Sequence, residues 1–231
     1  TSLAAVLRNY EWDWAGAERE HKRAIELNPN YPTGHQWYAE HLAFTGRHQD
    51  ALAEILKAQE LDPLSLIINS IIAWVYMNDR QYDKAIEQLR RVFEMDSSFA
   101  RAQYLFVIAY MSRGMNDREL AEVNRIQAKQ GISGRDIEAF NRAYKSGGKN
   151  GLARLRLTQL DTASKNQSKY SSAYAEAVNY AILGDKERAL SALDRCMEER
   201  DYDLTSLKSG FGVLRSDPRF IAILKKVGLD K

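Results

Sequence analysis

The apolar positions of residues 34–65 follow a helical spacing that is interrupted once. Apolar residues recur there every three or four positions, stop at Gly46, resume after it and end at Asp62 and Pro63. Because apolar residues at this spacing form one face of a helix, and glycine and proline interrupt helices, the stretch predicts two helices joined by a tight turn. We interpret it as a helical hairpin.

The hairpin pattern recurs along the chain with a fixed period. Pro29 and Pro63 are 34 residues apart. A period of this length is typical of repeat proteins built from stacked helical hairpins. The residue that breaks the pattern recurs at steps of 34, with a final step of 36, at Trp12, Gly46, Arg80, Gly114, Gly148 and Gly184. We predict an all-α chain of six hairpins in a single domain over residues 1–231, with units near 1–29, 30–63, 64–97, 98–131, 132–167 and 168–201.

Residues at fixed distances from each break have fixed sizes. Small side chains allow the two helices of a hairpin to approach closely, and a hairpin with two apolar faces needs neighbours to bury both. Five positions after the break, a small residue stands in five of the six units, at Ala17, Ala51, Ala85, Ala153 and Ala189. These columns therefore predict one stacked array.

The spacing, the small-residue columns and the closing proline of "YAEHLAFTGRHQDALAEILKAQELDP" resemble the tetratricopeptide repeat. The resemblance covers essentially the whole chain, although Ser97, Gly131, Lys165 and Asp201 stand where later units of that family have proline. It implies a right-handed α-solenoid whose first helices line a concave groove. It also implies a non-catalytic scaffold that binds a protein or peptide partner.

Three further segments resemble the C-terminal repeat arrays of large bacterial regulators. These are "YEWDWAGAEREHKRAIELNPNYPTGHQWYAEHL", "QELDPLS" and the tail "LRSDPRFIAILKKVGL". In those families an upstream winged-helix domain, nucleotide cyclase or protein kinase supplies the output. This resemblance implies the alternative of a sensory or regulatory domain, in which ligand binding shifts an equilibrium of the parent chain.

The period ends after residue 201, and the tail over 202–231 has its own pattern. Ser216 is the predicted N-cap of a last helix with Pro218 in its first turn. One apolar face follows at Phe220, Ile223, Leu224 and Val227. We expect this helix to cap the exposed end of the array.

Composition adds few constraints on function. The 33 basic and 31 acidic residues nearly balance, so no overall field favours nucleic acid or an anionic membrane. The longest apolar run, over 66–77, has 12 residues and is too short to span a bilayer. One cysteine excludes an internal disulfide and fits a reducing compartment. We expect the chain to be cytoplasmic, and to lie on the other side of a membrane only if the parent protein carries an upstream membrane span. The start at Thr1 predicts that the chain is a fragment or a processed product.

The residues that could take part in catalysis or bind a metal ion do not form a catalytic motif. His21 stands in the column of Ile55, Leu89, Val123, Leu157 and Leu193, and Cys196 in a column of small apolar residues, which favours packing for both. His41 and His48, with Glu40 and Asp50, make a weak alternative as a metal site. "SGGKNG" lacks the spacing and preceding strand of a phosphate loop. We expect no enzyme activity, no cofactor and no metal.

The resemblance places the partner-binding groove on specific columns of the first helices. Aromatic and arginine side chains are enriched in binding hot spots, and methionine gives adaptable contact. The alternative is that the apolar members only pack adjacent helices. The lysine and asparagine columns of a chaperone-binding clamp are absent. The predicted groove residues are Gln36, Glu40, Ser70, Trp74, Met77, Arg101, Tyr104, Ile108, Met111, Arg135, Glu138 and Arg142.

Unit five is locally basic, and its role is left open between a solvated face and an anionic partner site. The cations are Lys145, Lys149, Arg154, Arg156, Lys165 and Lys169. No aromatic ladder accompanies them, so we do not expect a nucleic-acid partner. The expected partner is a protein or peptide, or another domain of the same parent chain. Homo-oligomerisation stays open.

Overall fold

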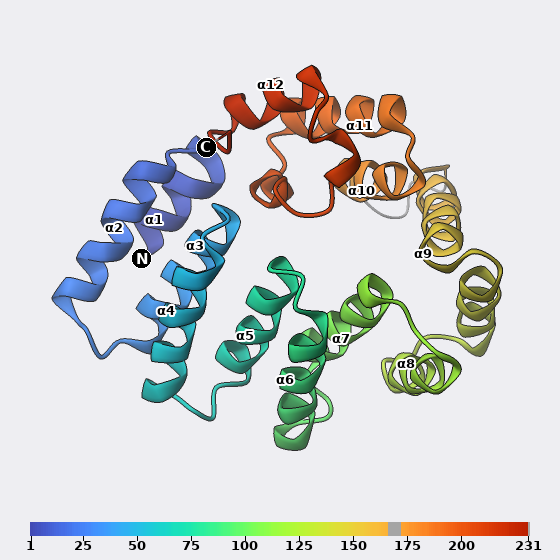
Figure 1. Cartoon of the computed structure of the whole chain (residues 1–231), viewed down its shortest axis with the longest axis horizontal. Helices are drawn as coiled ribbons and strands as arrows, with labels where there is room; N and C mark the ends of the chain where they lie inside the picture. The colour runs from blue at the N-terminus through green and yellow to red at the C-terminus, as the bar shows by residue number, and fades with distance from the viewer. Residues whose placement is uncertain (166–171, 231) are drawn as a thin grey trace. The chain divides into compact units, whose positions relative to one another are not determined.

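A computed structural model describes residues 1–165 and 172–230, and all regular secondary structure in these residues is helical (Figure 1). The expected all-α fold class is confirmed. The segments, with η for π and 3-10 helices, are α1 (Ser2–Val6), η1 (Leu7–Glu11), α2 (Trp14–Leu27), α3 (Pro32–Phe44), α4 (His48–Leu61), α5 (Leu66–Asn78), α6 (Tyr82–Met95), α7 (Ala100–Arg113), α8 (Asp117–Lys129), α9 (Gly134–Lys165), α10 (Ala173–Leu183), α11 (Lys186–Glu199), η2 (Tyr202–Ser206), η3 (Gly212–Leu214) and α12 (Pro218–Lys226).

The contacts between helices divide the chain into two compact units. Unit 1 is Thr1–Ile132 and contains α1 to α8, and unit 2 is Ser133–Lys231 and contains α9 to α12. The division falls between the fourth and fifth predicted hairpins. The predicted boundary at 167/168 lies outside the described residues, as does Lys169.

The six break residues all adopt the backbone conformation that ends a helix and turns the chain. Each has a positive φ, a conformation that glycine reaches without steric penalty. Two of the six are not glycine, and both have a left-handed backbone. The φ values are 55° for Trp12, 85° for Gly46, 58° for Arg80, 98° for Gly114, 54° for Gly148 and 78° for Gly184. The predicted turn positions are therefore confirmed.

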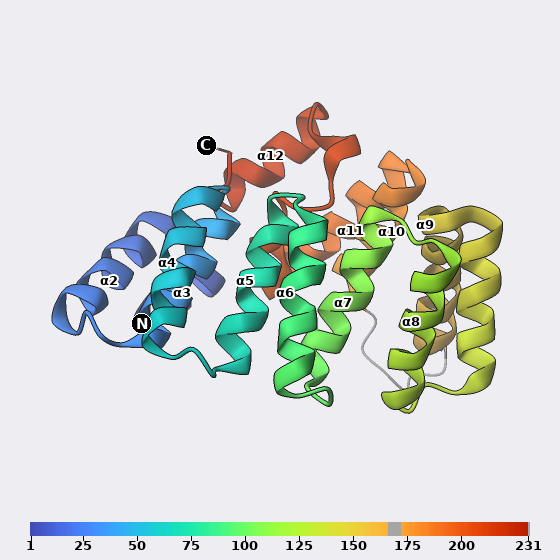
Figure 2. The same ribbon diagram turned by 60° about the horizontal axis from the view of Figure 1, so that its bottom comes forward.

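Unit 1 stacks its hairpins in two layers, with consecutive helices side by side (Figure 2). The first helices α3, α5 and α7 contact one another in sequence, and each second helix packs on the first helix that follows it. The predicted small-residue column is buried. Ala17, Ala51 and Ala85 are fully buried in unit 1, as is Ala189 in unit 2.

A polar side chain near the start of α3, α5 and α7 forms a hydrogen bond to the loop before each helix. The three residues are 34 apart, and each donates to a backbone carbonyl six residues earlier. His35 Nε2 lies 2.8 Å from the carbonyl oxygen of Pro29. Asn69 Nδ2 bonds the carbonyl of Pro63 at 3.0 Å, and Gln103 Nε2 bonds that of Ser97 at 2.8 Å. The repeat thus includes a polar contact that satisfies a loop carbonyl.

Two of these residues, His35 and Asn69, also bond the second helix of their own hairpin, 19 positions further on. His35 Nδ1 lies 2.7 Å from Glu54 Oε2, and Gln88 Nε2 donates to Asn69 Oδ1 at 3.1 Å. In the fifth hairpin this column holds Ile137, which cannot make either bond. The polar contact therefore extends only through unit 1 among the described residues.

Asn69→Leu is expected to lower the free energy of unfolding of unit 1 by about 2 kcal/mol, because it leaves buried hydrogen-bonding groups without a partner. Asn69 is 4% exposed. Its side-chain nitrogen donates to the carbonyls of Pro63 and Ser65, and its side-chain oxygen accepts from the side-chain amides of Gln59 and Gln88. Urea unfolding followed by tryptophan fluorescence measures the loss. Gln88→Leu removes one of these bonds and should lower the free energy of unfolding clearly less than Asn69→Leu does. Equal losses in the two variants would show that the bonds to the loop carbonyls contribute nothing to stability.

In unit 2, α9 is two helices that meet at Gly148, where φ is 54° and ψ is −135°. The predicted last helix is present as α12, and its expected apolar residues Phe220, Ile223 and Val227 are buried. The predicted N-cap at Ser216 is wrong. Asp217 is the N-cap, because its carboxylate accepts from the backbone N–H of Arg219 at 2.9 Å and so leaves Pro218 at the first helical position.

Helix α12 is fixed to the rest of unit 2 by aromatic and charged contacts. The Phe211 ring lies 5.7 Å from the rings of both Phe220 and Tyr174, which joins α12 to α10. Arg219 donates two hydrogen bonds of 2.7 Å to the Glu187 carboxylate on α11. The tail therefore packs on the α10–α11 hairpin.

Candidate functional site

Helices α5 and α7 carry most of the predicted partner-binding residues of unit 1. The Ser65 hydroxyl caps α5 by accepting from the N–H of Ile68 at 3.3 Å, and α7 ends at Gly114. Because the two helices lie side by side, side chains at the predicted columns share one face. We call this the first-helix face and define it by Glu40, Trp74, Met77, Arg101, Tyr104, Ile108 and Met111.

The first-helix face is a mixture of exposed and half-buried side chains. Tyr104 is 63% exposed, and Arg101 is exposed one helical turn before it. Ile108 and Met111 follow on the same helix and are half-buried. Trp74 is also half-buried and meets the ring of Phe44 edge-on at 5.0 Å. Trp74 therefore has both roles that the sequence left open, because it packs a neighbouring helix and keeps part of its ring accessible.

Two of the predicted groove residues are buried, and this part of the prediction is corrected. Ser70 has no exposed surface, and its hydroxyl donates to the Ile67 carbonyl at 2.7 Å. Gln36 is 9% exposed and donates to Glu40 at 3.2 Å. Both positions are therefore inside the fold and do not contribute to an exposed groove.

The remaining predicted residues, Arg135, Glu138 and Arg142, belong to unit 2 and are exposed on α9. Arg142 Nη1 lies 3.6 Å from Glu138 Oε2 one turn earlier. They form a surface of their own, and we treat them separately from the first-helix face.

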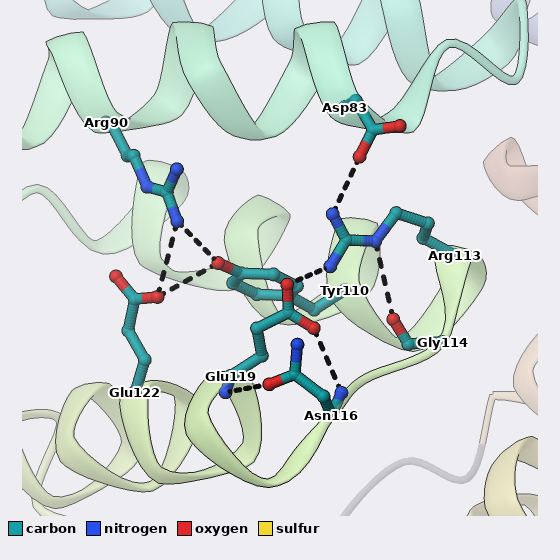
Figure 3. Close-up of polar contacts among 8 residues, drawn as sticks. All are labelled: Asp83, Arg90, Tyr110, Arg113, Gly114, Asn116, Glu119 and Glu122. Carbon is teal, nitrogen blue, oxygen red and sulfur yellow. Dashed lines mark hydrogen bonds and ion pairs between the residues drawn. The ribbon is translucent and has the colours of Figure 1, made fainter.

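A network of charged side chains fixes α7 against the helices on its other side (Figure 3). Buried Tyr110 accepts a hydrogen bond of 2.9 Å from Arg90 on α6 and donates one of 2.9 Å to Glu122 on α8. Burial, aided by the bond to Glu122, raises the pKa of Tyr110 to about 12. The phenol therefore stays protonated and keeps both bonds.

The end of α7 is held in the same way. Arg113 donates to Asp83 on α6 at 2.7 Å and also bonds Glu119 on α8. Its guanidinium lies 5.1 Å from the centre of the Tyr110 ring. Glu119 in turn closes a capping box with Asn116 at the start of α8. These bonds attach α7 to α6 and α8, so the opposite side of α7 is held in a fixed position.

The histidines of unit 1 lie in the helix packing. His21 and His41 are each 1% exposed, their ring centres are 5.4 Å apart, and Trp14 and Tyr38 pack against them. Burial lowers the pKa of His21 to about 3 and that of His41 to about 4. The packing prediction for His21 is confirmed. Within residues 1–165 and 172–230 no three His, Cys, Asp or Glu side chains are grouped closely enough to hold a metal ion.

The single cysteine is part of the core of unit 2. Cys196 has no exposed surface, as its column predicted, and burial raises the pKa of its thiol to about 12. A thiol that is protonated and inaccessible is a poor nucleophile.

Unit 1 has a pocket that none of the residues defining the first-helix face lines. It is open to solvent and lies between the loop before α7 and the end of α8. Five of its seven lining residues have polar side chains. The lining residues are Ser97, Ser98, Ala100, Gln103, Lys129, Gln130 and Ile132.

Comparison with known proteins supports the repeat family. Residues 68–99, which include most of α5 and all of α6, match the family model described as Tetratricopeptide repeat. No curated protein matches the chain. The match and the consecutive packed hairpins together support a tetratricopeptide repeat protein. Such repeats generally mediate protein–protein interaction, which supports a scaffold role. None of the described helices is both long and apolar enough to cross a bilayer.

Proposed function

We propose that the protein is a non-catalytic scaffold whose first-helix face in unit 1 binds a peptide, a helix or a folded protein partner. The observation that carries the proposal is the exposure of Tyr104, at 63%, beside exposed Arg101 and half-buried Ile108 and Met111. Tyrosine and arginine dominate binding hot spots, and methionine adapts its shape to different contacts. A large aromatic ring held in water on a rigid helix can bury its area against a partner.

The titratable groups of unit 1 fit this non-catalytic role. The groups with strongly lowered pKa values are packed or paired. His21 and His41 lie inside the helix packing. Although burial raises its pKa, hydrogen bonds from Lys22 and Arg47 lower the pKa of Glu18 to about 2. The two rings are enclosed by the fold and the carboxylate is paired with cations, so neither situation presents an acid or base to a substrate. The alternative function is that of a regulatory domain in a bacterial multidomain protein. Such a domain would use the same face to bind its ligand or the output domain of its own parent chain.

Arg101→Glu with Tyr104→Ala is expected to lower recovery of the partner at least tenfold in affinity capture from a lysate of the source cell. Both side chains are exposed, so the variant should keep its helicity, which circular dichroism measures. The matched control is Arg23→Glu with Tyr31→Ala, the same two changes at exposed positions of the first hairpin and the loop after it. If the folded variant and the control retain the partner equally, the first-helix face is not the binding surface.

A further inference from the structure

The charge of the chain is unevenly distributed, and its positive excess comes from one helical hairpin. Residues 139–160 hold five Lys and Arg and no acidic residue. The rest of the chain holds 28 basic and 31 acidic residues. The near-neutral total therefore conceals a concentrated positive segment, which is the middle of α9 around the turn at Gly148.

The five cations are exposed, and the geometry of α9 groups them. We call them the α9 basic surface. Helical spacing places Arg142 and Lys145 on one face before the turn, and Lys149 and Arg156 on one face after it. Arg154 reaches back over the turn, because its Nη1 lies 3.6 Å from where a Cβ of Gly147 would be. The α9 basic surface is made of Arg142, Lys145, Lys149, Arg154 and Arg156.

Several arginines elsewhere in the chain are paired with carboxylates, unlike most of these cations. Arg47, Arg113 and Arg219 each bond two carboxylates. On the α9 basic surface only Arg142 has an ion pair with a described residue, to Glu138 at 3.6 Å. Uncompensated like charges repel one another, so a polyanion that lies across them gains attraction and relieves that repulsion.

We propose that the α9 basic surface binds an acidic polypeptide segment. This rests on the proposed role of the chain as a protein-binding scaffold and adds a second surface of defined chemistry. Charge complementarity with a partner would contribute association rate and selectivity. The interaction is expected to weaken with salt, since exposed charges are screened within about 8 Å at physiological ionic strength.

The surroundings of the cations favour a polypeptide over a nucleic acid or a membrane. Phe140 and Tyr144, the aromatic residues of α9, are half-buried, so neither offers an open ring on which a base can stack. None of the large apolar side chains in the described part of α9 is exposed, and a membrane-binding helix needs such side chains to insert between lipids. An acidic peptide needs only the complementary charge.

The test measures binding of the whole protein to three defined probes by fluorescence anisotropy and co-sedimentation. The probes are a labelled ten-residue peptide with six glutamates, a labelled single-stranded oligonucleotide of 20 nucleotides, and vesicles with one quarter phosphatidylserine. Lys145→Gln/Lys149→Gln/Arg154→Gln removes three charges from the surface. The matched control Arg19→Gln/Arg23→Gln/Lys225→Gln removes three exposed charges from α2 and α12.

We expect the acidic peptide to bind at 50 mM salt, to lose at least tenfold in affinity in the α9 variant, and to keep its affinity within twofold in the control. Tighter binding of the oligonucleotide or the vesicles than of the peptide would overturn the proposal. So would absence of peptide binding, or equal losses in variant and control. Arg101→Glu/Tyr104→Ala should leave peptide binding unchanged, which separates this result from the outcome for the first-helix face.

Discussion

Lowering the pH from 7 to 4.5 is expected to destabilise unit 1 by about 5 kcal/mol, because two buried histidines must stay neutral in the folded state. The folded pKa values of His21 and His41 are about 3 and about 4, against 6.5 in the unfolded chain. Below pH 6.5 the unfolded state takes up protons that the folded state does not. Stability is therefore full above pH 6.5 and is lost as the pH falls toward the folded pKa values.

Most of the charges around the two rings lower the histidine pKa values, as burial does. After burial, the positive charge of Arg8 lowers the pKa of His41, and the neighbouring histidine and Arg8 lower that of His21. The carboxylate of Glu18 opposes this for both rings. Glu18 itself, with its pKa of about 2, contributes stability that is lost only below pH 4.5. The histidines therefore dominate the interval between pH 6.5 and 4.5.

His21→Leu tests this cause directly. Neither ring nitrogen of His21 has a hydrogen-bond partner among residues 1–165 and 172–230, and the same column holds Ile55, Leu89 and Leu193, which are fully buried. The variant should be more stable at pH 7 by about 1 kcal/mol, because it removes unsatisfied buried polar atoms. It should also halve the loss at pH 4.5.

Urea unfolding at the two pH values, followed by tryptophan fluorescence, measures both effects. All four tryptophans lie in unit 1, at Trp12, Trp14, Trp37 and Trp74, so the signal reports that unit alone. His48→Gln is the control, since His48 is partly exposed and lies outside the ring cluster. An unchanged loss at pH 4.5 in His21→Leu would show that the buried ring is not the cause.

Gly151→Ala is expected to destabilise unit 2 by about 3 kcal/mol through steric overlap in the α9 hairpin. A Cβ at position 151 would lie 1.9 Å from the carbonyl oxygen of Ala143, which is backbone of the facing helix. The two halves of α9 would have to separate, and the contacts of buried Leu152 and Ala153 would loosen.

Circular dichroism during thermal or urea unfolding measures this loss, and the tryptophan transition should not move because unit 2 contains no tryptophan. Gly147→Ala is the matched control on the same helix. Its Cβ would meet only Arg154 Nη1 at 3.6 Å, so its stability should stay within about 1 kcal/mol of wild type. A loss in Gly147→Ala as large as in Gly151→Ala would contradict the steric explanation.

Only part of the candidate site could be predicted from the sequence. The repeat columns correctly placed Arg101 and Tyr104 on an exposed face, because residues at the same repeat position point in the same direction. They also included Ser70 and Gln36, which are buried in the folded chain. A column records the direction of a side chain and contains no information on how closely the next helix approaches.

The polar contact made by His35, Asn69 and Gln103 escaped sequence reasoning for a related reason. The three residue types differ, so the column shows no identity, although each can donate to a carbonyl. The 34-residue spacing of these donors, together with the spacing of their acceptors at 29, 63 and 97, was the available signal.

The sequence by itself determined the period, the hairpins, the turn residues and the small-residue contacts, because these depend on local helix geometry and on the absence of a side chain at turns. Only the tertiary structure decided which face residues stay in water, which histidines become buried and unpaired, and that the contacts form two compact units that divide after Ile132. Burial and pairing depend on residues distant in the chain, and no local pattern specifies the distance between them.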